Sequence, residues 1–159
     1  MNDYTTSAKG IALIKEFEGC HLKAYPDPKT GGAPWTIGWG ATGADIVPGL
    51  VWTQEQADAR LIEDVVLREI MVKKAVTIEI TQGIFDAVVS IVFNVGAGSK
   101  IRDGIIRLKS GKPSTLLKKL NLGDFAGCSV EFLKWISPGS TVTAGLLRRR
   151  KAEVVLFKA

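Results

Sequence analysis

The first clear pattern in the chain is a set of apolar residues at helical spacing near its start. Ile11, Ile14 and Phe17 recur every three residues, which places them on one face of a helix. Gly19 is a residue type that commonly ends helices, so the pattern predicts a helix that ends at about Glu18. Glu18 lies four residues after Ile14 and therefore shares the apolar face, where an ionised carboxylate is costly unless it is paired.

The next segment cannot be helical. Eight proline and glycine residues lie between Pro26 and Gly43, and they break any helical pattern. Within this segment Trp35, Ile37 and Trp39 alternate with smaller residues, which is the period of a β-strand. We therefore predict two short strands, with a loop at residues 30–32 between them.

A long amphipathic helix is predicted from Thr53 to about Ala75. Thr53 and Gln56 have the spacing of a capping box, in which the two side chains bond to backbone N–H groups at the start of the helix. The apolar stripe of this helix is expected to consist of Ala57, Leu61, Val65 and Ile70.

The remaining sequence predicts only helices. Thr81 can cap a strongly apolar helix that ends at Gly96, and we expect this helix to be buried at the centre of its lobe. Shorter helices are predicted near residues 104–109, 114–120 and 125–135, and a last one begins near Thr143.

These elements predict an α+β fold in one domain of 159 residues. A small N-terminal lobe with a β-hairpin is expected at about residues 10–52. The long helix at residues 53–75 is expected to join it to an all-helical C-terminal lobe at residues 76–159.

Composition and charge narrow the classes of function. The net charge of +5 suits an anionic partner such as cell wall, a membrane surface or nucleic acid. The two cysteines, Cys20 and Cys128, and the single histidine are too few for a disulfide scaffold or a Cys/His metal site. We therefore expect free thiols, no metal and no cofactor. No known reading motif accompanies the basic residues, so we expect no nucleic-acid partner.

The sequence predicts neither a signal peptide nor a transmembrane segment. The first ten residues lack a basic stretch followed by an apolar one. No stretch approaches the roughly 20 apolar residues that a bilayer requires. We therefore expect synthesis in the cytoplasm without an export route of the chain's own.

Three polar residues in the N-terminal lobe suggest chemistry. Glu18 on an apolar helix face favours the protonated form, whereas Asp27 stands between two prolines in an extended segment and is expected to stay ionised. Thr36 points away from the apolar face of its strand. Two carboxyl groups in unlike environments suit glycosidic bond cleavage. Spacing alone also allows a structural interpretation, with Glu18 paired to an arginine and Asp27 forming a turn.

Motifs along nearly the whole chain resemble the phage-type lysozymes, the endolysin muramidases of glycoside hydrolase family 24. They include Glu18-Gly19, LKAYPD at residues 22–27, WTIGWG at 35–40, FNVGAG at 93–98, STLL at 114–117, Gly145-Leu146, Arg149-Arg150 and Glu153. The resemblance implies a phage-lysozyme-like fold. It also implies hydrolysis of the bond between N-acetylmuramic acid and N-acetylglucosamine in peptidoglycan.

The resemblance assigns roles to individual residues. Glu18 matches the general acid of the family, Asp27 the second carboxylate and Thr36 the threonine that helps hold the attacking water. One arginine of the last helix is expected to pair with Glu18, for which we choose Arg149 over Arg148. The candidate substrate-binding residues are Tyr25, Thr42, Asn94 and Trp135.

The sequence departs from its relatives in three places. The segment from Asp27 to Thr36 is longer than in compact relatives, which reshapes the cleft mouth but keeps the motif residues. Ala41 stands where many relatives have a histidine after the Gly-x-Gly turn. Residues 101–113 look like an insertion, which we expect to add a helix to the far wall of the groove.

Two other functions are compatible with the sequence. One is a lytic transglycosylase, which uses an acid and no water. The other is a basic module that disrupts wall or membrane without catalysis. For the muramidase, the resemblance implies peptidoglycan as substrate, a monomer, and residence in the host cytoplasm until a phage holin allows release. Both inversion and retention of the anomeric centre are compatible with the sequence.

Overall fold

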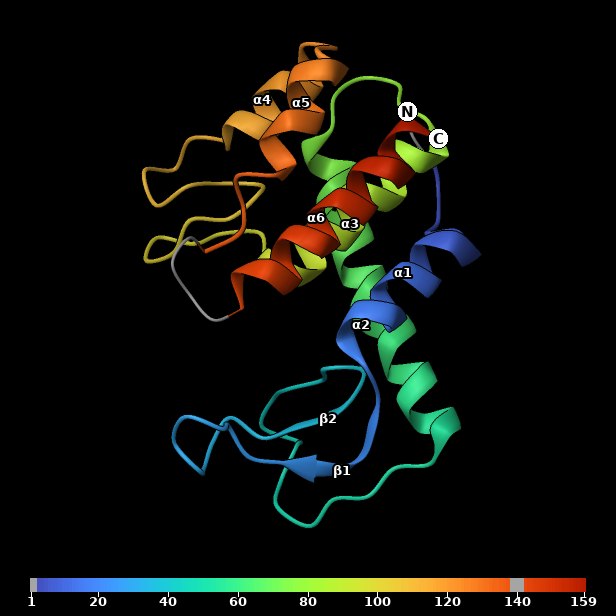
Figure 1. Cartoon of the computed structure of the whole chain (residues 1–159), viewed down its shortest axis with the longest axis vertical. Coiled ribbons are helices and arrows are strands. Elements are labelled where there is room, and N and C mark those ends of the chain that lie inside the picture. The colour runs from blue at the N-terminus through green and yellow to red at the C-terminus, as the bar shows by residue number, and fades with distance from the viewer. Residues whose placement is uncertain (1–2, 138–141) are drawn as a thin grey trace. The chain divides into compact units, whose positions relative to one another are not determined.

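The computed structural model describes residues 3–137 and 142–159 (Figure 1). The chain divides into two compact units, of which the smaller is Ile14–Leu67 and the larger combines Met1–Leu13 with Arg68–Ala159. The described elements are α1 (Ala8–Glu18), β1 (His21–Tyr25), β2 (Thr36–Gly38), α2 (Gln54–Ala75), α3 (Gln82–Val95), α4 (Thr115–Asn121), α5 (Phe125–Phe132) and α6 (Thr143–Lys158). This mixture of one hairpin and several helices is the predicted α+β class.

The smaller unit is built around the predicted hairpin. Strands β1 and β2 are antiparallel, and the paired residues are His21 with Gly38 and Tyr25 with Thr36. Ile37 at the centre of β2 is completely buried, as its place in the alternating pattern predicts. The apolar cluster beneath the hairpin consists of Ala24, Ile37, Ala41 and Ile46, with Trp35, Leu50 and Trp52 packed against it.

A third segment covers the free edge of β1. The backbone N–H of Ala24 donates to the carbonyl of Leu50 at 2.9 Å, and the N–H of Trp52 donates to the carbonyl of Leu22 at 2.8 Å. The strand β1 therefore has hydrogen-bonded neighbours on both sides, although only β2 is long enough to count as a strand.

The capping box of α2 forms as predicted. The backbone N–H of Thr53 donates to Oε1 of Gln56 at 2.8 Å, and the N–H of Gln56 donates to Oγ1 of Thr53 at 3.2 Å. The predicted stripe is wrong in its last member, because Ile70 is 51% exposed. The buried face continues instead through Glu69 and Val72.

Glu69 can occupy this buried face because its carboxylate has partners. Its Oε1 accepts hydrogen bonds from the backbone N–H and the hydroxyl of Thr6, each at 2.7 Å. A buried carboxylate that accepts such bonds recovers much of the hydration that it loses.

Helix α3 is the buried centre of the larger unit. Its hydroxyl cap Thr81 accepts from the N–H of Ile84, and the nine residues 84–92 are all buried. Helix α6 packs along it, as the red ribbon of α6 and the yellow-green ribbon of α3 show in Figure 1, and α5 packs against α4 and α6. The predicted central position of this helix in its own unit is therefore correct.

Two predictions in the larger unit are wrong. No helix forms at residues 104–109, and the insertion at 101–113 adds none. Instead, the N–H groups of Ile105 and Ile106 donate to the carbonyls of Gly96 and Ala97, so they cannot make bonds to residues four positions earlier. The completely buried Ile105 anchors this loop. The helix predicted at 125–135 is real but ends earlier, at Phe132.

Candidate functional site

Glu18 lies in the last turn of α1 and is half-buried, and Ile14, one turn before it, is completely buried. The helix ends there because Gly19 has a φ of +67°, a left-handed conformation that favours glycine. The predicted helix end and the place of Glu18 beside an apolar residue are both correct.

Gly40 lies directly against the carboxyl group of Glu18. A Cβ atom at position 40 would lie 2.9 Å from Oε2 of Glu18, and the φ of +88° at Gly40 also disfavours any other residue. The turn after β2 therefore brings backbone, rather than a side chain, up to the carboxyl group. The hydrophobic pattern does not identify Gly40 as a residue of the site. The signal in the sequence that could have identified it is its place as the last residue of the WTIGWG motif.

Asp27 is held in a turn just beyond the end of β1. Its Oδ1 accepts from the N–H of Lys29 at 2.9 Å, and its backbone carbonyl accepts from the N–H groups of Thr30 and Gly31 at 3.2 and 2.8 Å. The side chain is half-buried, so the prediction of an exposed extended segment is only partly correct. The turn fixes both the backbone and one carboxylate oxygen of Asp27.

Thr36 begins β2 opposite Tyr25 of β1. Its neighbours Trp35 and Ile37 belong to the apolar cluster, and Thr36 itself is half-buried. The smaller unit thus contains all three predicted catalytic residues: a carboxyl group at a helix end, a carboxylate in a turn and a hydroxyl on a strand. This set can in principle donate a proton, support a developing positive charge and orient a water molecule.

Two candidate substrate-binding residues also lie in the smaller unit. Tyr25 is half-buried, and its ring meets that of His21 edge to face with centroids 4.8 Å apart. Thr42 is exposed, and its carbonyl accepts from Nη2 of Arg60 at 3.1 Å. Arg60 also bonds to Asp45 at 2.8 Å, and this hydrogen bond holds the pKa of the Asp45 carboxyl below its ordinary value.

Asn94 and Trp135 lie in the larger unit and line the same cavity of about 310 Å³. The other lining residues are Val95, Arg102, Asp103, Lys134, Ile136, Ser137 and Leu146. Oδ1 of Asn94 accepts from Nη2 of Arg150 at 2.6 Å, which fixes the orientation of the amide. The fold therefore brings Asn94 and Trp135, which are 41 positions apart in the sequence (135 − 94), to the wall of one cavity.

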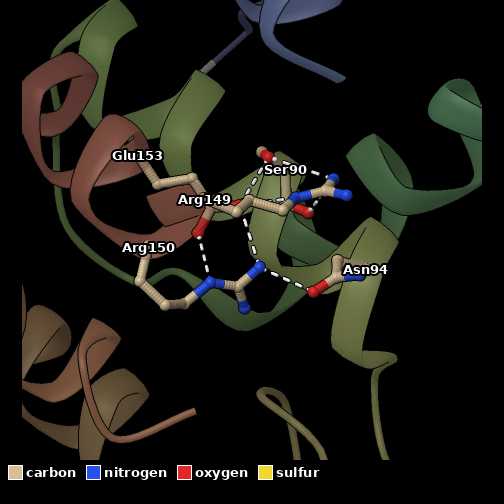
Figure 2. A network of polar contacts seen from close by, with 5 residues as sticks. All are labelled: Ser90, Asn94, Arg149, Arg150 and Glu153. Carbon is tan, nitrogen blue, oxygen red and sulfur yellow. Dashed lines mark hydrogen bonds and ion pairs between the residues drawn. The ribbon is translucent and has the colours of Figure 1, made fainter. Parts of the chain in front are cut away.

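Arg149 belongs to a buried network on α6 (Figure 2). Nε of Arg149 lies 3.2 Å from Oε1 of Glu153, and Nε of Arg150 lies 2.9 Å from Oε2. The hydroxyl of Ser90 on α3 donates to Oε1 of Glu153 at 2.6 Å. Burial raises the pKa of the Glu153 carboxyl, and the two guanidinium groups oppose this effect. The predicted pairing of Arg149 with Glu18 stays a prediction.

The described part of the chain holds neither a cluster of metal ligands nor a membrane-spanning helix. No group of three or more histidine, cysteine, aspartate or glutamate side chains in residues 3–137 and 142–159 is arranged to hold a metal ion. Among the helices that these residues form, none combines the length and apolarity needed to cross a bilayer. Both cysteines are free thiols.

Comparisons with known proteins agree on one family. The phage lysozyme family model matches residues 15–153. The endolysin of Acyrthosiphon pisum secondary endosymbiont phage 1 is 40% identical over 157 residues, which cover 96% of this chain and 97% of that protein. The endolysin of Bacillus phage B103 is 42% identical over 95% of this chain, but the match spans only 53% of that longer relative.

A solved structure supports the same assignment of fold. The muramidase domain of SpmX from Asticaccaulis excentricus superposes with a TM-score of 0.81 at 32% sequence identity. The superposition covers 98% of this chain and 99% of that one. The phage-lysozyme-like fold predicted from the sequence is therefore confirmed.

Proposed function

The chain belongs to the phage lysozyme family, and from this membership and the residues of the smaller unit we propose that it is an endolysin with muramidase activity. It hydrolyses the β-1,4 bond between N-acetylmuramic acid and N-acetylglucosamine in the peptidoglycan of the host. The observation that carries the proposal is the placement of Glu18, Asp27 and Thr36 together in one compact unit around the hairpin.

Glu18 acts as the general acid. It donates its proton to the glycosidic oxygen as the bond from that oxygen to C1 of the muramic acid residue breaks. Two features of the structure support this role, namely the half-burial of Glu18 and the lack of a side chain at Gly40, which lets the backbone of the turn after β2 lie against the carboxyl group. The proposed pairing with Arg149, taken from the family resemblance, would hold the carboxyl group in position.

Asp27 and Thr36 act on the other side of the reaction. The Asp27 carboxylate stabilises the positive charge that develops on the sugar, and Thr36 orients the water that attacks C1. If Asp27 also accepts the proton of that water, the anomeric centre is inverted. Inversion needs carboxyl groups about 6.5–9.5 Å apart and retention about 5–5.5 Å, so the anomer formed first reports on this separation.

The glycan is proposed to contact four further residues. Tyr25 and Thr42 contribute from the smaller unit. Asn94 and Trp135 contribute from their shared cavity, where an indole can stack on a sugar and an amide N–H can donate to an acetamido carbonyl.

The decisive experiment compares Glu18→Gln with Glu16→Gln in lysis of Gram-negative cells stripped of their outer membrane. Glu16 is on the same helix but exposed, so its variant controls for charge and for helix stability. Loss of a general acid should slow lysis by about 10²–10⁴-fold, whereas the control should lyse at the rate of the unmodified protein. Lysis by Glu18→Gln at the unmodified rate would leave only a non-catalytic basic module as an explanation.

Analysis of the soluble products separates hydrolysis from transglycosylation. Hydrolysis leaves a reducing sugar end, and a lytic transglycosylase leaves an anhydro sugar. The presence of Thr36 argues for hydrolysis. A lytic transglycosylase forms its anhydro sugar by an intramolecular reaction, in which a hydroxyl that holds water has no role. In the cell, we propose that the endolysin waits in the host cytoplasm and reaches the wall when a phage holin permeabilises the inner membrane.

A further inference from the structure

Asp58, in the second turn of α2, gathers three side chains around one carboxylate oxygen. Its Oδ1 accepts from Nε1 of Trp39 at 2.7 Å and from Nε2 of Gln54 at 3.0 Å. Nζ of Lys15 lies 3.5 Å from the same oxygen. The hydrogen bonds from Trp39 and Gln54 hold the pKa of the Asp58 carboxyl below its ordinary value, so it is a carboxylate at neutral pH.

The groups around Asp58 come from three separate segments of the smaller unit. Lys15 belongs to α1, Trp39 to the turn after β2, and Asp58 to α2. The ammonium group of Lys15 also lies 5.1 Å from the centroid of the Trp39 ring, within the range of a cation–π interaction. The carboxylate therefore ties the turn and the helix α1 to a common point on α2.

The turn that Asp58 holds is the one that lies against the proposed general acid. Trp39 directly precedes Gly40, whose backbone approaches the carboxyl group of Glu18. Gly40 has no side chain with which to fix its own position, so the turn depends on its neighbours. The indole of Trp39 is a large, rigid group with one N–H to donate, and Asp58 accepts that hydrogen bond.

The same network also reaches the end of α1 that carries Glu18. Lys15 lies three residues before Glu18, a spacing that makes the two neighbours on a helix surface. Gln54 donates to Sγ of Cys20 at 3.7 Å, two residues after Glu18, as well as to Asp58. Contacts of Asp58 and its partners therefore flank Glu18 on both sides in the sequence.

We infer that Asp58 is a positioning residue for the proposed general acid, because it holds the Trp39–Gly40 turn against the carboxyl group of Glu18. This inference rests on the proposed function. Asp58 and Lys15 are partly exposed, and ion pairs in such settings contribute little to stability. The main effect of the network is therefore on the geometry of proton transfer. Since Asp58 is not among the residues proposed to contact the glycan, its loss should lower kcat and leave KM nearly unchanged.

The test is the rate at which purified peptidoglycan releases reducing sugar ends, measured over a range of substrate concentrations so that kcat and KM separate. Asp58→Ala should lower kcat by about 10–100-fold, because a small displacement of a catalytic group is costly. Asp58→Asn keeps an oxygen that can accept from Trp39 and should retain most of kcat. Glu63→Ala is the matched control, since Glu63 is an exposed acidic residue of the same helix, and it should behave like the unmodified protein.

A double-mutant cycle tests the route through Trp39. Trp39→Phe removes the N–H donor and keeps an aromatic ring, so it should also lower kcat. Combined with Asp58→Ala it should lower kcat no further than Asp58→Ala does alone. Melting temperatures show that each variant is folded at the temperature of the assay.

Three results would overturn the inference while the unmodified protein is active and Glu18→Gln is not. They are an unchanged kcat in Asp58→Ala, a loss confined to KM, and losses that multiply in the double variant. Activity of Glu18→Gln equal to that of the unmodified protein would instead overturn the proposed function, and this inference with it.

Discussion

The backbone of Gly40 approaches the carboxyl group of Glu18 so closely that a Cβ at position 40 would lie 2.9 Å from Oε2. This contact joins the end of α1 to the turn after β2 within the smaller unit. The proposed proton donor is therefore positioned by a residue that has no side chain and that bears no charge.

The first prediction follows from this contact. Gly40→Ala should destabilise the protein by about 1–2 kcal/mol, because alanine is disfavoured at a φ of +88°. It should also slow wall lysis, because the new methyl group displaces the Glu18 carboxyl. Gly49→Ala is the control, since Gly49 has a φ of +84° and a Cβ there would have no neighbour within 4 Å. Equal melting temperatures and equal lysis rates in the two variants would contradict the positioning role.

Glu153 provides a second prediction, on stability. Glu153→Gln removes the negative charge that Arg149 and Arg150 share in a fully buried setting, and a buried charge that loses its counter-ion is strongly destabilising. We expect a loss of about 3 kcal/mol in chemical denaturation. Lys151→Gln, at an exposed position of the same helix, should change stability by less than about 0.5 kcal/mol. A neutral Glu153→Gln would show that the network contributes little to stability.

The two thiols should differ in reactivity. Burial raises the pKa of the Cys128 thiol to about 12, and its side chain is inaccessible in α5. Cys20 is half-buried and accepts a hydrogen bond from Gln54 at 3.7 Å. We expect Ellman's reagent at pH 8 to modify one thiol per folded chain and two in denaturant. Cys20→Ser should abolish the reaction of the folded chain, and a remaining rapid reaction would contradict the burial of Cys128.

Glu131 predicts a pH dependence of stability. The hydrogen bond from Lys134 at 2.7 Å lowers the pKa of this carboxyl, and Lys119 at 3.4 Å adds to the effect. Since the pKa is lower in the folded state, the contribution is complete above the ordinary glutamate pKa of about 4.3 and is lost as the pH falls through the folded value. We expect at most about 1 kcal/mol, because Lys134 is largely exposed.

Denaturation at pH 7 and pH 3 measures this contribution. The unmodified protein should lose more stability between the two pH values than Glu131→Gln. Glu55→Gln, at an exposed position of α2, should behave like the unmodified protein. If all three proteins lost the same stability between pH 7 and pH 3, Glu131 would not contribute to the acid sensitivity of the fold.

The sequence predicted helices and strands correctly where the interactions that form them are between residues close together in the chain. The capping pair Thr53 and Gln56 interact within one turn, and Thr81 caps α3 in the same way. The residues of the smaller unit were found for a related reason, because the hairpin places segments close in sequence next to each other. Glu18, Asp27 and Thr36 lie within 19 positions of one chain segment (36 − 18 + 1).

Predictions failed where a distant partner decides the outcome. The apolar pattern predicted that Ile70 is buried, yet Glu69 is buried instead, because Thr6, 63 positions away, satisfies its carboxylate. The loop at residues 101–113 is anchored on the carbonyls of Gly96 and Ala97, which no helical period can reveal. In the same way, the motif Arg149-Arg150 was visible, but its link to Ser90 depends on how α6 packs on α3.

The segment that covers β1 makes this strand the middle member of a three-stranded arrangement rather than an edge. Backbone N–H groups on both of its sides are engaged, so slow amide hydrogen exchange should mark β1 and Trp52 in the folded protein. A shielded edge also offers no template to a strand of another chain, which protects the hairpin from aggregation. The turn that carries Asp27 is therefore attached to a strand that can neither fray from one side nor recruit a neighbour.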